Sequence, residues 1–307
     1  MSHPARVVHI PTRGPFRLEE LGTFGYGHLT LQPWDGVWRL AFGLDDHSGQ
    51  AGVEVRQVAP EELELTVHAA PGSVEAAVRQ AARIASCDHD GNAFHALGAA
   101  DPVLRRLLAA APGLRPPLFV SPYEAAVWAL LTQRRSRRQG TVMRQWISDR
   151  HGVAFDLAGR RVSAMPLPER LLEVEVVPGL PREQVPRLHA VARAALDGRL
   201  DVDRLAALDP ETARRELEAI PGIGPFSSAL IVMRSCGLSD VLPVAEPRSR
   251  AAVTALYADA GVITGELTDE GYRELARAWR PFRTWVAVMA RAAGGRVAAW
   301  PAGAATG

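Results

Sequence analysis

The chain has 307 residues, of which 47% are hydrophobic, and its formal net charge is +1. This length exceeds one average domain and predicts two or three folded domains. No run of eighteen apolar residues occurs and no basic segment precedes an apolar N-terminal stretch, so neither a membrane span nor a signal peptide is expected. Cys87 and Cys236 stand alone in the sequence, which excludes a four-cysteine iron–sulfur cluster or a zinc site built from cysteines.

The charge is distributed unevenly along the chain. Residues 1–112 carry 9 arginines and 13 acidic residues, a net −4, whereas residues 113–307 carry 26 arginines and 21 acidic residues, a net +5. The second part is therefore the candidate for binding a polyanion. All 35 basic residues are arginines, so no lysine side chain is present to form a Schiff base.

The first hundred residues alternate between apolar and polar side chains, as β-strands do. The pattern predicts strands over residues 28–34, 37–44, 51–58 and 62–69. A helix is expected from Ser73, a candidate N-cap, to Ser86. Residues 1–100 thus predict a small α+β domain with a helix packed on one face of an antiparallel sheet.

From Asp101 onward the periodicity is almost entirely helical, and eight to ten helices are interrupted at proline and glycine clusters. Ser121 and Glu124 match a capping box at the start of one of these helices. We expect a helical domain over residues 101–295 and a flexible tail over residues 296–307.

A two-glycine turn separates two of the predicted helices at Ile220-Pro-Gly-Ile-Gly-Pro225. Gly222 and Gly224 lack a Cβ atom and can both take positive φ, which lets the turn expose successive amides. Pro225 suits the first position of the next helix, whose N-terminal amides and positive dipole end favour an anion. The turn is therefore a candidate phosphate site. The alternative is an ordinary glycine stop followed by a proline start.

Six spaced motifs, taken in order, resemble the helix-hairpin-helix superfamily of DNA glycosylases, most closely its bacterial 3-methyladenine DNA glycosylase II type. The motifs are Gly113-Leu-Arg-Pro-Pro, Ala129-Leu-Leu-Thr-Gln133-Arg-Arg-Ser136, Gly179-Leu-Pro, Ile220-Pro-Gly-Ile-Gly224, Asp240-Val-Leu-Pro243 and Trp279-Arg-Pro-Phe-Arg283. The resemblance covers about residues 113–295. It implies a sheet domain followed by two helical lobes that flank a DNA cleft, with the target base flipped out of the duplex.

The resemblance also assigns roles to the two-glycine turn. The amides around Gly222, Ile223 and Gly224 are expected to hold a phosphate beside the lesion. The backbone carbonyls of Glu218, Ile220 and Ile223 are expected to hold a monovalent Na⁺ or K⁺ ion.

A second DNA contact is implied at Gln133, Arg134, Arg135 and Ser136. Relatives carry in this segment the residue that fills the gap left by the flipped base, and Arg134 stands at that place instead of the usual apolar residue. An arginine can fill the gap by stacking its planar guanidinium while its neighbours bind phosphates. The alternative is a solvated, arginine-rich helix start.

Glu246 is the catalytic candidate by resemblance. Relatives carry an aspartate there, which stabilises the positively charged sugar as the base leaves. Glutamate supplies the same charge, but it is not a preferred N-cap residue and its extra methylene moves the carboxylate, so we expect it to be less firmly held. A solvent-facing acid at a helix start is the alternative, and Asp240 is a weaker candidate that is otherwise a turn residue.

Phe226 stands where strand-cleaving relatives carry a lysine, which implies a monofunctional enzyme with water as the nucleophile and no lyase activity. Its ring is expected to stack on the flipped base. Leu230 and Arg291 replace aromatic residues of the relatives' base pocket, and an arginine repels a cationic alkylated base, so the identity of the lesion stays open. Other aromatic residues are expected in the core or the cleft wall, namely Trp279, Phe282 and Trp285.

These inferences favour a base-excision-repair enzyme that hydrolyses the N-glycosidic bond of damaged, alkylated bases in double-stranded DNA. No cofactor besides the cation of the turn is expected. We expect a monomer that does not associate with membranes and acts in the cytoplasm with the nucleoid. The main alternative is a DNA-binding lesion sensor that keeps the fold without excision. A helical protein unrelated to nucleic acid is a third reading.

Overall fold

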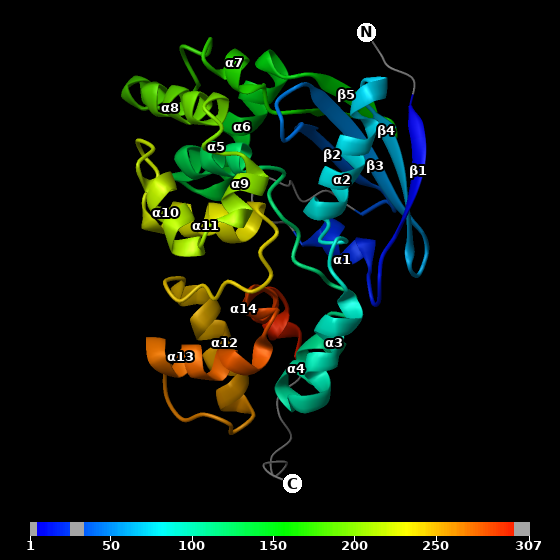
Figure 1. Ribbon diagram of the computed structural model, residues 1–307, viewed down its shortest axis with the longest axis vertical. Helices are drawn as coiled ribbons and strands as arrows, with labels where there is room; N and C mark the ends of the chain where they lie inside the picture. The colour runs from blue at the N-terminus through cyan, green and yellow to red at the C-terminus, as the bar shows by residue number, and fades with distance from the viewer. Residues whose placement is uncertain (1–4, 25–33, 298–307) are drawn as a thin grey trace.

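The structure is a computed structural model that describes residues 5–24 and 34–297 (Figure 1). Its N-terminal part is a four-stranded antiparallel sheet with the strand order β1-β4-β3-β2. The strands are β1 (Arg6–Pro11), β2 (Trp38–Gly43), β3 (Gln50–Ala59) and β4 (Glu62–His68). Helices make up most of the remaining chain, which confirms the predicted α+β class.

Three of the predicted strands are present as β2, β3 and β4, to within one residue at each end. The strand predicted at residues 28–34 lies outside the described residues except for Trp34, which is not in a strand. β1 is absent from the predicted set, although it pairs with β4 at the sheet edge. Its signal is the alternation of Val8 and Ile10 with exposed His9, and it ends at Pro11, which an edge strand tolerates.

The predicted helix packs on this sheet as α2 (Val74–Ile84) and buries Ala77, Ala81 and Ile84. A 3₁₀ turn, η1 (Pro71–Ser73), runs directly into it. Ser73 therefore has φ −104° and ψ −3°, and its side chain makes no capping hydrogen bond. The prediction that Ser73 caps this helix is wrong because the chain is already coiled there.

Two groups of helices follow, each with a buried apolar interior. The hairpin lobe has its own core and contains α5 (Pro122–Thr132), α6 (Arg137–His151), α7 (Pro168–Leu171), α8 (Val185–Leu196), α9 (Val202–Ala207), α10 (Pro210–Glu218) and α11 (Pro225–Ser235). The terminal lobe shares a core with the sheet and contains α3 (Gly91–Ala100), α4 (Pro102–Ala110), α12 (Pro247–Asp259), α13 (Asp269–Leu275) and α14 (Arg283–Ala293).

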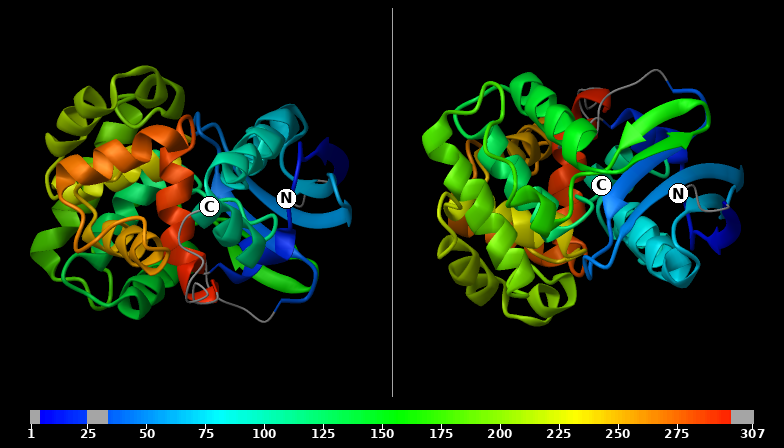
Figure 2. Two further views of the ribbon diagram at one scale, coloured as in Figure 1. Left: turned by 90° about the horizontal axis from the view of Figure 1, so that it is seen from below. Right: turned by 90° about the horizontal axis from the view of Figure 1, so that it is seen from above.

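Smaller elements connect these parts. They are α1 (Leu18–Thr23), β5 (Ala154–Leu157), β6 (Arg160–Ser163), and the 3₁₀ turns η2 (Arg182–Gln184), η3 (Ala276–Trp279) and η4 (Gly294–Arg296). Figure 2 shows the green-to-orange helices on one side of the molecule and the blue strands on the other. Within the described ranges, no helix combines the length and apolar character that crossing a bilayer requires.

The domain boundary predicted at residues 100 and 101 falls between α3 and α4, which pack against each other. The Phe94 ring in α3 lies 5.3 Å from that of Phe282 and 5.0 Å from that of Trp285, between ring centroids. Tyr257 in α12 donates a hydrogen bond to Asp101, the N-cap of α4. Both helices thus contact the C-terminal helices.

The tail predicted from residue 296 lies almost wholly outside the described residues, and the division into domains stays a prediction.

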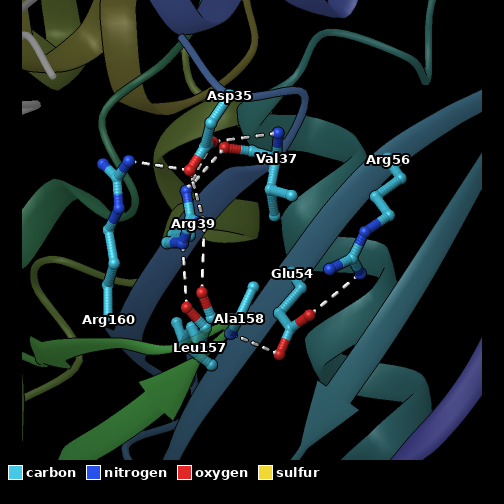
Figure 3. Close-up of polar contacts among 8 residues, drawn as sticks. All are labelled: Asp35, Val37, Arg39, Glu54, Arg56, Leu157, Ala158 and Arg160. Carbon is cyan, nitrogen blue, oxygen red and sulfur yellow. Dashed lines mark hydrogen bonds and ion pairs between the residues drawn. The ribbon is translucent and has the colours of Figure 1, made fainter. Parts of the chain in front are cut away.

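The β5–β6 hairpin extends from the hairpin lobe onto the sheet, where polar contacts fasten it (Figure 3). Arg39 Nε in β2 donates to the Leu157 carbonyl at 2.8 Å, and the Ala158 amide donates to Glu54 in β3 at 2.9 Å. Arg39 also donates to Asp35, and this bond lowers the pKa of Asp35 to about 2. The sheet therefore braces the hairpin lobe from the side.

At the start of the central helix α5, the predicted capping box is half formed. Ser121 Oγ accepts from the Glu124 amide at 3.1 Å. The Glu124 carboxylate does not return to the Ser121 amide but pairs with Arg144 of α6 at 2.9 Å. Burial raises the pKa of Glu124. The buried Glu124 carboxylate therefore joins α5 to α6 by an ion pair instead of capping α5.

Arg115, in the first of the six motifs, is 1% exposed and makes no ion pair with a carboxylate of the described residues. Its guanidinium instead donates to backbone carbonyls of two segments far away in the sequence. The acceptors are Arg13, Gly14, Pro15, Ser86 and His89. Arg115 thereby joins the N-terminal segment and the end of α2 to the start of the helical region.

Replacement of Arg115 by methionine should lower the free energy of unfolding by at least about 3 kcal/mol, because several buried carbonyls lose their donor. Urea denaturation of the full chain measures this change. The matched control is Arg17→Met at an exposed position, which should change stability by less than about 0.5 kcal/mol. Equal losses in the two variants would contradict a structural role for Arg115.

Candidate nucleic-acid interface

The two-glycine turn joins α10 to α11, as predicted, and one of its glycines has positive φ. Gly222 has φ +94°, and an added Cβ would lie 2.6 Å from Leu130 Cδ2 and 3.0 Å from Arg187 Cδ. Gly222 is thus needed both for its conformation and for the close approach of α5 and α8. Gly224 has φ −101° and ψ −179°, so the expectation that both glycines use positive φ is wrong for Gly224. It serves as the N-cap of α11, where an extended backbone is usual.

Gly224 matters because of the open space in front of it. An added Cβ there would meet no heavy atom within 4 Å. Among the described residues, the amides of Gly222 and Gly224 donate to no acceptor. Pro225 occupies the first turn of α11, as predicted. The free amide of Gly224 and the positive end of an eleven-residue helix therefore lie beside open space, and Gly222 supplies a second amide without an acceptor, an arrangement suited to an anion such as phosphate.

Ile223 lies differently from its two neighbours. Its side chain is 4% exposed in the core of the hairpin lobe, and its amide donates to the Ile220 carbonyl at 3.0 Å. Ile223 therefore holds the turn from within. That bond uses one lone pair of the Ile220 carbonyl and leaves the other available. The cation predicted at the carbonyls of Glu218, Ile220 and Ile223 stays a prediction. Among the residues that the structure describes, no group of three or more His, Cys, Asp or Glu side chains is placed to hold a metal.

A side-chain bond closes the base of the turn. Ser228 Oγ in α11 donates to Glu218 Oε1 at the end of α10, at 2.7 Å, and Ser228 is fully buried. This contact fixes α10 against α11 and keeps the turn in one shape.

The loop between α5 and α6 contains the four other predicted DNA-binding residues. Arg134 is exposed with φ +56°, a strained value for a residue with a side chain, and it makes no hydrogen bond or ion pair with any described residue. Gln133 accepts from Arg187, and Arg135 donates to Gln184. Ser136 forms a full capping box with Gln139 at the start of α6. The strain thus falls on the one residue of the four whose side chain is free.

A cavity of about 630 Å³, here the hairpin cavity, lies between this loop and the two-glycine turn. Phe226 projects into it with 59% of its surface exposed, and Leu230 lines it one helical turn later. The aromatic Phe119, before α5, and Trp128, within α5, line it too, and sequence reasoning missed both because an aromatic side chain next to or within an apolar helix looks like core. Its other lining residues are Ala129, Thr132, Gln133, Arg134, Arg137, Gly224, Pro225, Ser227, Arg248 and Arg291.

A second cavity of about 710 Å³, here the carboxylate cavity, adjoins the first. Glu246 lines it, and Phe226 and Leu230 line both cavities. Gly224 of the two-glycine turn and Glu246, which belong to different lobes, therefore line neighbouring cavities that share these two side chains. Trp279, Phe282 and Trp285 line neither cavity and are buried in the core, as one of the two predicted placements has it.

Glu246 is held more firmly than the sequence analysis predicts. It is the N-cap of α12, with Pro247 in the first turn. Its Oε1 accepts from the Arg248 amide at 3.3 Å and its Oε2 accepts from the Ser249 amide at 2.6 Å, so both carboxylate oxygens are engaged. The expectation of a loosely held glutamate is wrong because the longer side chain folds back onto its own helix.

One cation lies close to that carboxylate. Arg291 Nη1 in α14 is 3.8 Å from Glu246 Oε1, and the side chain of Glu246 is only 13% exposed. The predicted pocket residue Arg291 thus reaches both the hairpin cavity and the carboxylate. Tyr272 is also nearby: burial and, less strongly, Glu246 raise its pKa.

Asp240 has a different partner. Its Oδ1 accepts from Arg283 Nε at 2.7 Å, its Oδ2 accepts from Arg283 Nη2 at 3.0 Å, and its carbonyl accepts from the same group at 2.7 Å. The fifth and sixth motifs of the sequence therefore contact each other. This pairing gives Asp240 a role in fixing residues 236–246, which connect α11 in the hairpin lobe to α12 in the terminal lobe.

Comparison with known proteins gives relatives and fold neighbours, although no family model matches the chain. A protein of Mycobacterium tuberculosis named as a probable bifunctional transcriptional activator/DNA repair enzyme AlkA is 30% identical over 289 residues. The match covers 91% of this chain but 55% of that relative, so the chain spans about half its length.

Two solved structures share the fold. The 3-methyladenine DNA-glycosylase of Archaeoglobus fulgidus superposes with a TM-score of 0.74 at 21% identity, covering 92% of this chain and 97% of that one. The 8-oxoguanine glycosylase/lyase of Clostridium acetobutylicum superposes with a TM-score of 0.62 at 15% identity, covering 97% and 99%. The resemblance that the six motifs indicate is confirmed.

Replacement by alanine should destabilise the protein at Gly222 but not at Gly224. Gly222→Ala is expected to lower the free energy of unfolding by about 1–3 kcal/mol, because it combines unfavourable φ with a clash against Leu130. Gly224→Ala should change stability by less than about 0.5 kcal/mol. Denaturation of both variants measures the difference, and a larger loss for Gly224→Ala would contradict the requirement for glycine at position 222.

Proposed function

We propose that this chain, which has the helix-hairpin-helix DNA glycosylase fold and is related in sequence to a DNA repair enzyme, is a monofunctional DNA glycosylase of base excision repair. Its substrate is double-stranded DNA that contains damaged, alkylated bases. It hydrolyses the N-glycosidic bond of a base flipped from the duplex. The observation that carries the proposal is that Gly224 of the two-glycine turn, whose amide has no acceptor among the described residues, and Glu246 line two neighbouring cavities that share Phe226 and Leu230.

The chemistry follows from that arrangement. Backbone phosphates bound at the two-glycine turn offset the cost of unstacking the target base. The base stacks on the exposed ring of Phe226, and the gap in the duplex is filled by Arg134. Glu246 then stabilises the positive charge that develops on the sugar as the glycosidic bond breaks and the base leaves with its electron pair. Water adds to the sugar carbon and loses a proton to solvent or to the departing base. A monovalent cation at the carbonyls of Glu218, Ile220 and Ile223 is part of this proposal.

The proposed enzyme has no lyase activity, for a chemical reason. Strand cleavage through a Schiff base needs an amine nucleophile, and the chain contains no lysine. Phe226 cannot supply one. One of the two fold neighbours is named a glycosylase and the other a glycosylase/lyase, so the fold does not decide between the two activities. The support for the monofunctional assignment comes from the side chains.

A second function, a lesion sensor that binds damaged DNA without excision, is favoured by one contact. The Arg291 guanidinium, 3.8 Å from Glu246, offsets part of the negative charge that catalysis needs. The same guanidinium repels a cationic base in the hairpin cavity, so the lesion panel must include neutral damaged bases.

An excision assay separates the two functions. Purified protein is incubated with duplexes that carry methylated, deaminated or oxidised bases, and abasic sites are scored as strand breaks after alkali. We expect excision of at least one alkylated base. Glu246→Gln should reduce the rate by about 100-fold or more while leaving DNA affinity unchanged, because it removes the charge that faces the sugar.

The matched control is Glu266→Gln, at an exposed acid that lines neither cavity, and it should retain full activity. Full activity of Glu246→Gln would contradict the catalytic assignment. Abasic sites on none of the lesions, with DNA binding intact, would favour the sensor.

A further inference from the structure

A third cavity, of about 370 Å³ and here called the arginine cavity, lies between the α5–α6 loop and the start of α8. It shares Gln133 and Arg134 with the hairpin cavity, so the two lie next to each other. Its lining residues are Gln133, Arg134, Arg135, Gln184 and Arg187. Three of these five side chains are cationic and none is acidic.

None of the three arginines has an acidic partner among the described residues. Arg135 donates to the Gln133 carbonyl at 3.1 Å and to Gln184 Oε1 at 3.0 Å. Arg187 donates to Gln133 Oε1 at 3.1 Å, and Arg134 donates to nothing. The three positive charges around this small cavity repel each other, and no acidic side chain lines the cavity to offset the repulsion. An anion bound in the cavity would offset it.

The arginine cavity also lies beside the two-glycine turn. A Cβ added to Gly222 would lie 3.0 Å from Arg187 Cδ, so the Arg187 side chain runs along the turn. Arg134, whose backbone is strained at φ +56°, lines both cavities and has no partner for its guanidinium among the described residues. Strain of this kind persists where the surrounding structure imposes it, and it is concentrated at binding sites.

We propose that the arginine cavity binds a second backbone phosphate of the DNA, separate from the one at the two-glycine turn, with Arg187 and Arg135 as its ligands. This inference rests on the DNA-binding part of the proposed function and not on excision. Arginine suits the role because its planar guanidinium donates two parallel hydrogen bonds to phosphate oxygens. Gln133 and Gln184 hold the two guanidinium groups in place before the phosphate arrives.

The test is the salt dependence of binding to a duplex that contains a stable abasic-site analogue. Each phosphate contact contributes about 0.9 to the slope of log affinity against log salt. Arg187→Gln should lower that slope by about one and weaken binding about tenfold at moderate salt. Arg187→Lys should keep the slope, because it keeps the charge. The matched control, Arg193→Gln, removes a charge from an exposed position of the same helix and should change neither quantity.

A neutral methylphosphonate placed at single positions of either strand identifies the phosphate. One position should weaken binding of the unchanged protein but not of Arg187→Gln. An unchanged slope in Arg187→Gln, an equal loss in Arg193→Gln, a loss of slope in Arg187→Lys, or the absence of any such position would overturn the inference. Protein that excises no base but shows the Arg187-dependent slope would reject the proposed glycosylase and retain this phosphate site.

Discussion

The ion pair between Asp240 and Arg283 is the constraint on which the rest of the site depends. The chain leaves the hairpin lobe at the end of α11 and must reach Glu246 at the start of α12, in the terminal lobe. Along this path Asp240 is held by Arg283 at 2.7 Å, and Thr284 bonds to the backbone on both sides of it. The relative position of the turn and the carboxylate is therefore set by the first turn of α14. A free linker would let the two lobes move apart.

The site combines polar groups that have no partner among the described residues with a carboxylate whose two oxygens are already bonded. The amides of Gly222 and Gly224 are left without acceptors, and the guanidinium of Arg134 without a partner, among the described residues. The Glu246 carboxylate is the opposite case, since two amides and Arg291 already surround it. In the proposed function, the groups that would bind phosphate are left without partners, whereas the carboxylate that would face the transient charge is fixed in advance. Fixed dipoles and charges of this kind need no reorganisation when the charge develops.

Much of this arrangement could be predicted from the sequence, because local patterns carry it. The strands β2, β3 and β4 follow alternation, and the turn follows glycine and proline chemistry. The prediction for Glu246 failed locally, because glutamate is not a preferred N-cap residue and yet its carboxylate accepts from the amides of Arg248 and Ser249 in its own helix. The capping box failed because of a distant partner, since Glu124 pairs with Arg144 of another helix, which no local pattern reveals. The arginine cavity was missed for the same reason, since Arg187 comes from a helix about fifty residues after the loop that it faces.

The central claim is that the turn and Glu246 act on one DNA strand across a shared space. The most direct measurement is a crystal structure of the protein bound to duplex DNA in which a cationic pyrrolidine replaces the sugar of the damaged nucleotide. The account predicts the pyrrolidine nitrogen within about 4 Å of a Glu246 oxygen, the range of an ion pair, and a neighbouring phosphate on the amides of Gly222 and Gly224. A complex in which the pyrrolidine lies away from Glu246, or the phosphates bypass the turn, would contradict it.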